Sequence, residues 1–247
     1  MKQPHTKYSI FSILLILALA LVLGNQASAS AITYSGSSGN LSASATFSLA
    51  GNILTVTLSN TSLSDVLVPA DVLAGIWFDN THKLTPVSAN RNGSSVFYGA
   101  LSNVGDGWGY YSGLAGAGHG MKDGIVAAGF GIGGGHSNFS AAHDSLGGLN
   151  YGVLSAGDNT VTGNAGVKGH GPLIKNSVQF ALSTARGFNL SELGNSVVFQ
   201  YGTSLTEPSY SGYLQRPPAS VPEPGTLALV GSGMLGLAGL LRRKIKA

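Results

Sequence analysis

The 247-residue chain contains no cysteine, which excludes disulfide frameworks, cysteine nucleophiles, iron–sulfur clusters and zinc sites built on thiolates. It is also poor in charge, because Asp, Glu, Lys and Arg make up 9% of its residues, against roughly 25% in an average soluble domain. Hydrophobic residues nevertheless reach 43%, so the chain is not a charged, disordered polymer and has enough apolar side chains for a core. Its length allows one domain or two small ones.

The formal net charge of +3 belongs to the two ends of the chain. Of the thirteen Lys and Arg residues, two lie in the first 31 residues and four in the last six, which leaves seven basic against nine acidic residues between 32 and 221. A nucleic-acid-binding protein needs a basic patch that neutralises phosphates. The body of this chain carries a small negative charge instead, so we expect no nucleic-acid partner.

Residues 1–31 have the three parts of a secretory signal peptide. Two lysines make the start positive, and an almost entirely apolar stretch follows at 10–23. Small residues then occupy the positions that signal peptidase reads: cleavage after Ala29, with Ala27 two positions earlier, fits, and so does cleavage after Ala31. An N-terminal anchor that is not cleaved is the alternative. The pattern predicts export.

A second hydrophobic segment, 226–241, stands near the C-terminus and is followed at once by a tail that contains Arg242, Arg243 and Lys244. In a helix it would span about 24 Å at 1.5 Å per residue, which is short for a bilayer core of about 30 Å but usable when Arg and Lys snorkel. Basic residues beside a membrane helix stay cytoplasmic by the positive-inside rule. We therefore expect a transmembrane helix that holds the exported body outside; a buried core helix is the alternative.

A short proline motif, Pro222-Glu223-Pro224, precedes this hydrophobic segment. Two prolines around one glutamate fix an extended, non-helical stretch. The motif, the glycine-rich apolar segment and the terminal basic cluster, in that order, resemble the PEP-CTERM sorting signal of exosortase-dependent bacterial surface proteins. The resemblance covers residues 221–247.

In that family the signal is read by an exosortase, an integral-membrane enzyme. The resemblance implies that Pro222, Glu223 and Pro224 are recognition residues near the processing site. It likewise implies that Arg242, Arg243 and Lys244 form a basic retention cluster, and that none of the six is catalytic. The processed protein would be attached at the surface or released, commonly alongside exopolysaccharide production.

The body, residues 32–202, has the pattern of strands separated by glycine turns. Apolar and polar residues alternate with a period of two over 41–49, a turn follows at Ala50-Gly51-Asn52, and the alternation resumes over 54–58. Further strands, rich in β-branched and aromatic residues, are expected at 72–79, 95–100, 125–130, 177–183 and 196–201. No stretch of the body shows a convincing helical period.

We therefore predict an all-β fold with a single antiparallel β-sandwich or jelly-roll-like domain over 32–202. A Pro- and Ser-rich spacer at 203–220 would join it to the sorting signal at 221–247. The stretches 60–78 and 201–208 are also similar to uncharacterised exosortase-dependent surface proteins, a similarity that implies a secreted β-rich domain and brings no activity with it.

A glycine-rich region lies between Gly105 and Gly171, with 21 glycines in 67 residues. Because glycine loses the most backbone freedom on folding, we expect long loops here. Trp108, Tyr110 and Tyr111 near its start could form an exposed aromatic platform on which sugar rings stack. Aromatic residues that cap the edge of the sandwich are the favoured alternative.

The residues that carry catalytic or metal chemistry are scattered. The histidines of the body are His82, His119, His136, His143 and His170. Aspartates in or near the same loops are Asp106, Asp123, Asp144 and Asp158. They form no H-E-x-x-H, calcium-loop or G-x-S-x-G motif, so we expect no metal and no cofactor, with calcium on loop carboxylates as the open alternative.

Taken together, the sequence indicates an exported, exosortase-processed cell-surface or extracellular-matrix protein. We expect a structural or interaction role linked to exopolysaccharide and no catalytic activity. A glycan-binding module that uses exposed aromatics is the second interpretation, and a secreted hydrolase is the third. The expected partners are signal peptidase, exosortase, extracellular polysaccharide and, before processing, the inner membrane through residues 226–241.

Overall fold

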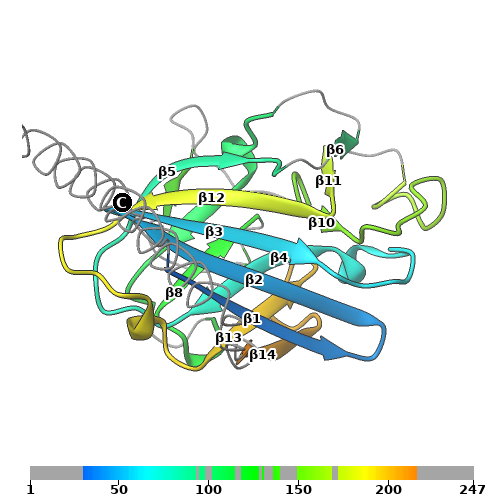
Figure 1. Ribbon diagram of the computed structural model, residues 1–247. Helices are drawn as coiled ribbons and strands as arrows, with labels where there is room; N and C mark the ends of the chain where they lie inside the picture. The colour runs from blue at the N-terminus through cyan, green and yellow to red at the C-terminus, as the bar shows by residue number, and fades with distance from the viewer. Residues whose placement is uncertain are drawn as a thin grey trace, which may run out of the picture. The chain divides into compact units, whose positions relative to one another are not determined.

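The computed structural model describes residues 30–92, 95–97, 102–114, 118–127, 130, 136–139, 149–168 and 172–215, which form one β domain (Figure 1). Fourteen strands are found among these residues: β1 (Ser30–Ser38), β2 (Leu41–Ala50), β3 (Ile53–Asn60), β4 (Leu73–Phe78), β5 (Thr85–Asn90), β6 (Ser95–Phe97), β7 (Gly109–Tyr111), β8 (Asp123–Val126), β9 (His136–Asn138), β10 (Val153–Leu154), β11 (Leu173–Lys175), β12 (Ser177–Ser183), β13 (Ser196–Tyr201) and β14 (Ser209–Gln215). Short 3-10 turns join them: η1 (Pro69–Asp71), η2 (Gly105–Gly107), η3 (Gly118–Gly120) and η4 (Leu190–Leu193).

The strands belong to one sheet. Their order across it is β5-β12-β3-β2-β1-β14-β13-β4-β10-β11-β6, and β7, β8 and β9 branch from β4. The pairs β1–β2, β2–β3, β3–β12, β13–β14 and β4–β13 are antiparallel, whereas β10 and β11 pair in parallel. The prediction of a mainly antiparallel all-β domain is confirmed.

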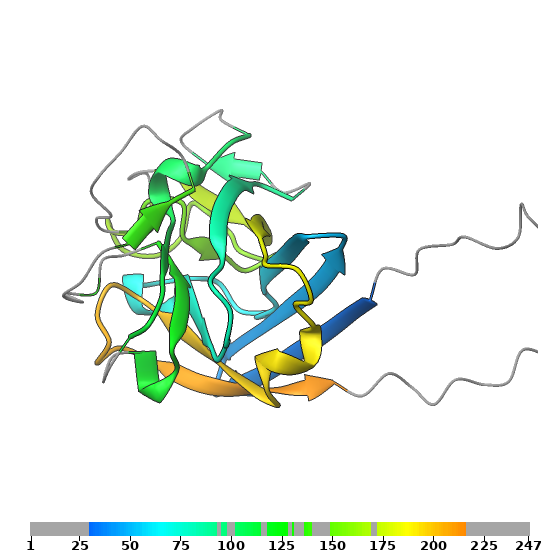
Figure 2. The ribbon, with the colours of Figure 1, turned by 90° about the vertical axis from the view of Figure 1, so that its left-hand side faces the viewer.

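The predicted division into two packed sheets is corrected by this topology. Hydrogen-bonded neighbours run without a break from β3 through β1 and β14 to β4, so the sheet curls around its core and nearly closes (Figures 1 and 2). Twist that accumulates over many strands curls a wide sheet in this way. The strands that bridge its two halves, β1 and β14, were not among the predicted strands.

Two glycine–asparagine turns fix the register of the first three strands. Gly39-Asn40 joins β1 to β2, with Ser38 paired to Leu41, and Gly51-Asn52 joins β2 to β3. Both glycines have φ of 59°, and a positive φ at the first of two turn residues alone is the type II′ geometry that suits a tight hairpin. The hairpin predicted over 41–58 is confirmed.

The core follows from the alternation of these strands. Ala43, Ala45 and Phe47 of β2 are buried, and the residues between them are partly exposed. In β3 the buried positions are Leu54, Val56, Leu58 and Asn60. The ring of Phe47 makes edge-to-face contacts with the rings of Tyr34 and Phe78, at centroid distances of 5.6 and 5.5 Å. These aromatic contacts join β1, β2 and β4.

Strand β4 is buried on both faces. Ile76 and Phe78 point into the main core, and Trp77 points to the other face, into a second cluster with Tyr111, Val126 and Val198. Gly124 of β8 lies against the Trp77 ring so closely that a Cβ there would stand 2.2 Å from it. Part of the glycine-rich region therefore covers the outer face of the sheet.

The ordered domain extends beyond its predicted end at 202. Residues 209–215, predicted as part of a Pro- and Ser-rich spacer, form β14, whose Tyr210, Gly212 and Leu214 face inward. Gly212 lies against the Phe199 ring, where a Cβ would come within 2.4 Å. A strand built on Tyr, Gly and Ser has a weak apolar signal, which explains the difference.

Candidate functional site

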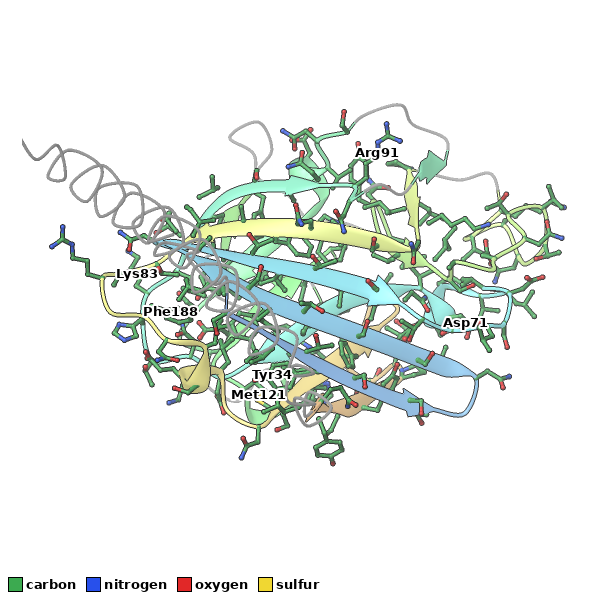
Figure 3. The ribbon with its side chains drawn as sticks, viewed as in Figure 1. Tyr34, Asp71, Lys83, Arg91, Met121 and Phe188 are labelled. Carbon is green, nitrogen blue, oxygen red and sulfur yellow. The ribbon has the colours of Figure 1, made fainter. Side chains whose placement is uncertain are left out.

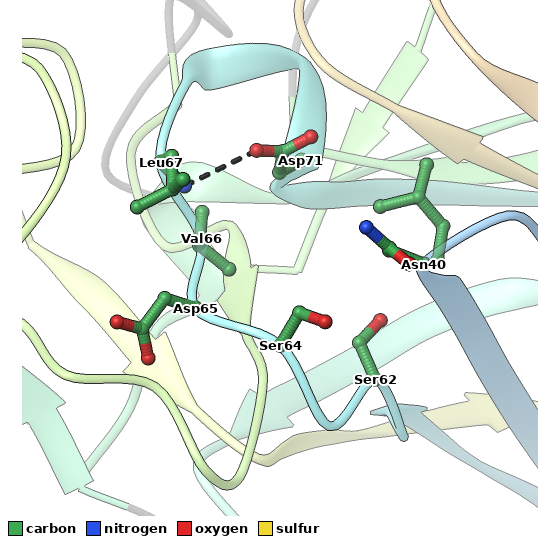
Figure 4. A pocket seen from close by; sticks show the side chains of 8 residues that line it. Asn40, Ser62, Ser64, Asp65, Val66, Leu67 and Asp71 are labelled. Carbon is green, nitrogen blue, oxygen red and sulfur yellow. Dashed lines mark hydrogen bonds between the residues drawn. The ribbon is translucent and has the colours of Figure 1, made fainter.

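An open groove of about 410 Å³ lies at one end of the β domain (Figure 4). It is lined by Asn40, Leu41, Ser62, Ser64, Asp65, Val66, Leu67 and Asp71. These residues come from the turn between β1 and β2, from the loop that follows β3, and from η1. We call the part of the domain that carries them the groove end.

Buried hydrogen bonds hold the loop behind the groove. The Asn60 side chain donates to the Val153 carbonyl at 2.9 Å and accepts from the Ser62 N–H at 3.1 Å. The buried Asp158 carboxylate accepts from the Val66 N–H at 2.7 Å. The Ser155 hydroxyl donates to the Ser64 carbonyl at 2.9 Å, so the segment after β10 fixes the groove loop from behind.

The Asp158 carboxyl is buried behind the groove loop. Burial raises the pKa of its carboxyl, and the hydrogen bond from Val66 and the nearby Lys175 partly offset that effect. The Lys175 ammonium donates to the Asp158 carbonyl oxygen at 2.8 Å. Both residues lie behind the groove and support its loop.

Three polar side chains on the groove keep hydrogen-bonding capacity. Among the described residues, none bonds to the Asn40 amide or to the Ser64 hydroxyl, which lie on facing sides of the groove (Figure 4). Asp71 accepts the Leu67 and Val68 N–H groups on Oδ2 at 3.1 and 3.2 Å, which leaves Oδ1 without a described donor. The groove can therefore donate and accept hydrogen bonds at its surface.

The lining is acidic. It contains the carboxylates of Asp65 and Asp71, and no Lys, Arg or His is among its eight described residues. Asp65 accepts from the Asn159 N–H and the Thr162 hydroxyl, both at 3.1 Å. A ligand that carries negative charge would meet two carboxylates and no compensating cation.

A family model for the PEP-CTERM protein-sorting motif matches residues 220–244. The chain carries a PEP-CTERM sorting signal. This match confirms the resemblance drawn from Pro222, Glu223 and Pro224, and it identifies the chain as an exported surface protein targeted to an exosortase. No curated protein and no solved structure matches the chain.

The residues of the two terminal signals lie outside the described residues; they are Ala27, Ala29, Pro222, Glu223, Pro224, the segment 226–241, Arg242, Arg243 and Lys244. Within the described ranges, no helix is long and apolar enough to cross a membrane. The PEP-CTERM signal begins five positions after Gln215, the last residue of β14.

The three aromatic residues considered for sugar stacking are buried. Trp108, Tyr110 and Tyr111 are 0%, 3% and 2% exposed. The Trp108 indole N–H donates to the Tyr151 carbonyl at 3.1 Å and its ring packs on Phe180. The expectation of an exposed platform at these positions is wrong, because Trp108 and Tyr110 pack into the main core and Tyr111 packs into the cluster around Trp77.

Tyr110 belongs instead to a buried polar cluster. Its hydroxyl donates to Asp123 Oδ1 at 2.9 Å, and burial raises the pKa of the Asp123 carboxyl from 3.8 to about 6. Such a shift is typical of catalytic acids as well as of structural ones. Asp123 is 4% exposed, however, so a substrate has no access to this carboxyl in the structure.

The described histidines lie apart from one another. His82 pairs with Glu192 at 2.9 Å, and His119 Nε2 bonds to Gln200 Oε1 at 2.8 Å. Because the Gln200 amide nitrogen faces backbone carbonyls, its oxygen faces His119, whose Nε2 must carry the proton. Across the described part of the chain, no group of three or more His, Asp or Glu side chains could hold a metal ion.

The remaining sequence candidates are placed as follows. His136 lies on β9, and Asp106 lies in η2. His143, Asp144 and His170 are outside the described residues.

The groove residues were missed in the sequence because Asn40, Ser64 and Asp71 look like ordinary turn residues. The groove loop falls within 60–78, one of the two stretches for which we expected a similarity to exosortase-dependent surface proteins. The structure brings the second stretch, 201–208, to the same end of the domain: the Gly202 N–H donates to the Val72 carbonyl at 2.9 Å.

Proposed function

We propose that this chain is a non-catalytic surface protein that an exosortase processes and that interacts, as a structural component, with extracellular polysaccharide. The observation that carries the proposal is the PEP-CTERM signal at 220–244, joined within a few residues to a β domain. Such a signal directs the domain to the cell surface, where an exported, weakly charged protein meets polymer rather than cytoplasmic substrates.

The strand boundaries support processing at both ends. Cleavage after Ala29 would leave β1 whole, because β1 begins at Ser30, whereas cleavage after Ala31 would remove its first two residues. Processing near Pro222–Pro224 would leave β14 whole, because β14 ends at Gln215. The mature product would then keep every strand of the sheet.

The test is the intact mass of the protein from culture medium and from membranes, in cells with and without the exosortase. We expect a product that begins at Ser30 and ends near Pro222–Pro224, and its loss when the exosortase is deleted. A chain that keeps its basic tail in both strains would contradict processing. Extraction of the polysaccharide fraction from the same cells should carry the product with it.

A secreted hydrolase is the competing function, and one observation favours it: Asp65 and Asp71 line the same groove. Glycoside hydrolases use such pairs of acids. Here Asp65 is tied to Asn159 and Thr162, and Asp71 caps η1, which supports structural roles for both. Release of reducing ends from a polysaccharide by the purified protein, abolished by Asp71→Asn, would overturn the non-catalytic proposal.

A further inference from the structure

We propose that the groove binds a neutral, hydroxyl-rich ligand, a short run of hexose units, and rejects anionic ones. The inference deepens the proposed function and rests on it, because it names the site and the class of polymer that the β domain would contact. The chemistry of the groove lining, the shape and charge of the groove, and its position in the fold all support this proposal.

Hydrogen-bonding capacity is the first argument. The Asn40 amide offers two donors and an acceptor, the Ser64 hydroxyl offers a donor and acceptors, and Asp71 Oδ1 is an acceptor. None of these has a partner among the described residues. Sugar hydroxyls both donate and accept, so adjacent hydroxyls on one ring can satisfy such a mixed set, whereas a cationic group could use only the acceptors.

The shape and the apolar wall are the second argument. Leu41, Val66 and Leu67 line the groove beside these polar groups, and aliphatic side chains pack against the C–H faces of a sugar ring. The volume of about 410 Å³ falls in the range of small-molecule sites, roughly 300–1,000 Å³. Because the groove is open, a polymer can extend beyond it.

Charge is the third argument, and it selects among polysaccharides. Asp65 and Asp71 are the charged groups of the lining. A uronate, sulfate or phosphate group in the groove would be repelled by both carboxylates. A neutral hexose has no such penalty and can donate its hydroxyl protons to them.

The groove is also built in advance of binding. Asn40 is held by the tight turn after Gly39, and the Ser64–Val66 backbone is held by Ser155 and Asp158. A ligand therefore does not have to order this loop, which reduces the entropic cost of binding.

Finally, β1 begins and β14 ends at the end of the domain opposite the groove. β1 runs from Ser30 to the Gly39-Asn40 turn at the groove, and β14 starts beside the end of β13, next to η1, and runs away from it to Gln215. Asp71 lies at the groove end, opposite Lys83 (Figure 3). The last residue of β14, Gln215, therefore lies at the end of the domain away from the groove.

The test is calorimetric titration of the full-length protein, purified from membranes in detergent, with three kinds of probe. These are neutral hexaoses of glucose and mannose, a hexamer of galacturonic acid, and a lysine-rich peptide. The variant is the double change Asn40→Ala with Ser64→Ala. Asn52→Ala is the matched control, because Asn52 holds the same place in the other type II′ turn, at the opposite end of β2.

We expect at least one neutral hexaose to bind, and the double variant to weaken its binding roughly ten-fold or more, because two side chains that would hydrogen-bond to it are lost. Asn52→Ala should bind as the unchanged protein does. Binding of the uronate or the peptide alone, no binding of any probe, or equal affinity of both variants would overturn the inference. A protein that is still processed and retained in polysaccharide would then show that the proposed function stands and that the groove is not its site.

Discussion

The meander of β1, β2 and β3 and the described part of the glycine-rich region 105–171 both contribute to the main core, but their backbone conformations are determined differently. In the meander, period-two alternation and two glycine turns agree with the final structure. Of the four described non-glycine residues with positive φ, three lie in the glycine-rich region: His119, Phe130 and Tyr151. Such conformations cost about 1 kcal/mol or more each. The local sequence therefore determines the backbone conformation of the meander, whereas tertiary packing must determine that of the glycine-rich region.

The largest expected effects come from removing one buried ring on each side of the sheet. Phe47→Ala empties the meander core, and Trp77→Ala empties the cluster under the glycine-rich region; both side chains are fully buried. We expect each change to lower the free energy of unfolding by about 3–5 kcal/mol, measured by urea denaturation. A loss under about 1 kcal/mol for Trp77→Ala alone would mean that the glycine-rich cover contributes little to stability.

A smaller effect should follow from adding a methyl group to a glycine of each region. Gly124→Ala places a Cβ 2.2 Å from the Trp77 ring, whereas at Gly51, with φ of 59°, a Cβ meets nothing within 4 Å. We expect a cost near the upper end of about 1–3 kcal/mol for overpacking at Gly124 and about 1 kcal/mol for backbone strain at Gly51. Thermal unfolding of the two variants compares them directly, and equal costs would contradict the close fit at Trp77.

The pH dependence of stability should give an effect smaller than that at Gly124, and it belongs to the glycine-rich side. Because burial raises the pKa of Asp123 from 3.8 to about 6, the folded protein holds that proton more tightly than the unfolded chain. The stabilisation is therefore complete below about pH 4 and lost as the pH rises through 6. The free energy of unfolding therefore falls between about pH 4 and pH 6, and Asp123→Asn should remove on the order of 1–2 kcal/mol of that fall.

Asp79→Asn is the control for that measurement. Asp79 is a nearby charge that raises the pKa of Asp123, and Tyr110, Asn80 and Gly113 donate hydrogen bonds that lower it. The slope should persist in Asp79→Asn, although slightly shifted to lower pH. Burial also raises the pKa of Asp158, so Asp123→Asn should retain a residual slope of the same sign. An unchanged slope in Asp123→Asn would contradict the role assigned to this carboxyl.

The sequence was most informative where local pattern and packing agree. Alternation over 41–58 predicted β2, β3 and their turn, and the aromatic and β-branched runs predicted β4, β12 and β13. Strand β1, which is rich in Ser and begins just after the predicted signal-peptide cleavage site, was missed. Its register depends on pairing with β2 and on the Tyr34 hydroxyl, which donates to the Gly194 carbonyl, and a local pattern does not contain such contacts.

The candidate functional residues likewise differ in whether a local sequence pattern predicts them. The PEP-CTERM signal is contiguous, so the sequence contains all of it, and the family-model match over 220–244 confirms the resemblance drawn over 221–247. The groove brings Asn40 next to Ser64 and Asp71, which belong to different loops, and their proximity is created by the sheet. The sequence also did not predict the burial of Trp108, because an aromatic residue between glycines has the same local pattern whether its side chain is exposed or buried.

The adjacency of β1 and β14 has a consequence for the timing of export. These are the first and last strands of the domain, and the sheet is continuous only when they pair. During translocation β1 emerges early and must wait with one edge unpaired until Gln215 has crossed. The connector and the PEP-CTERM signal come directly after Gln215 in the chain. We therefore expect the sheet to be completed only shortly before the sorting signal reaches the membrane.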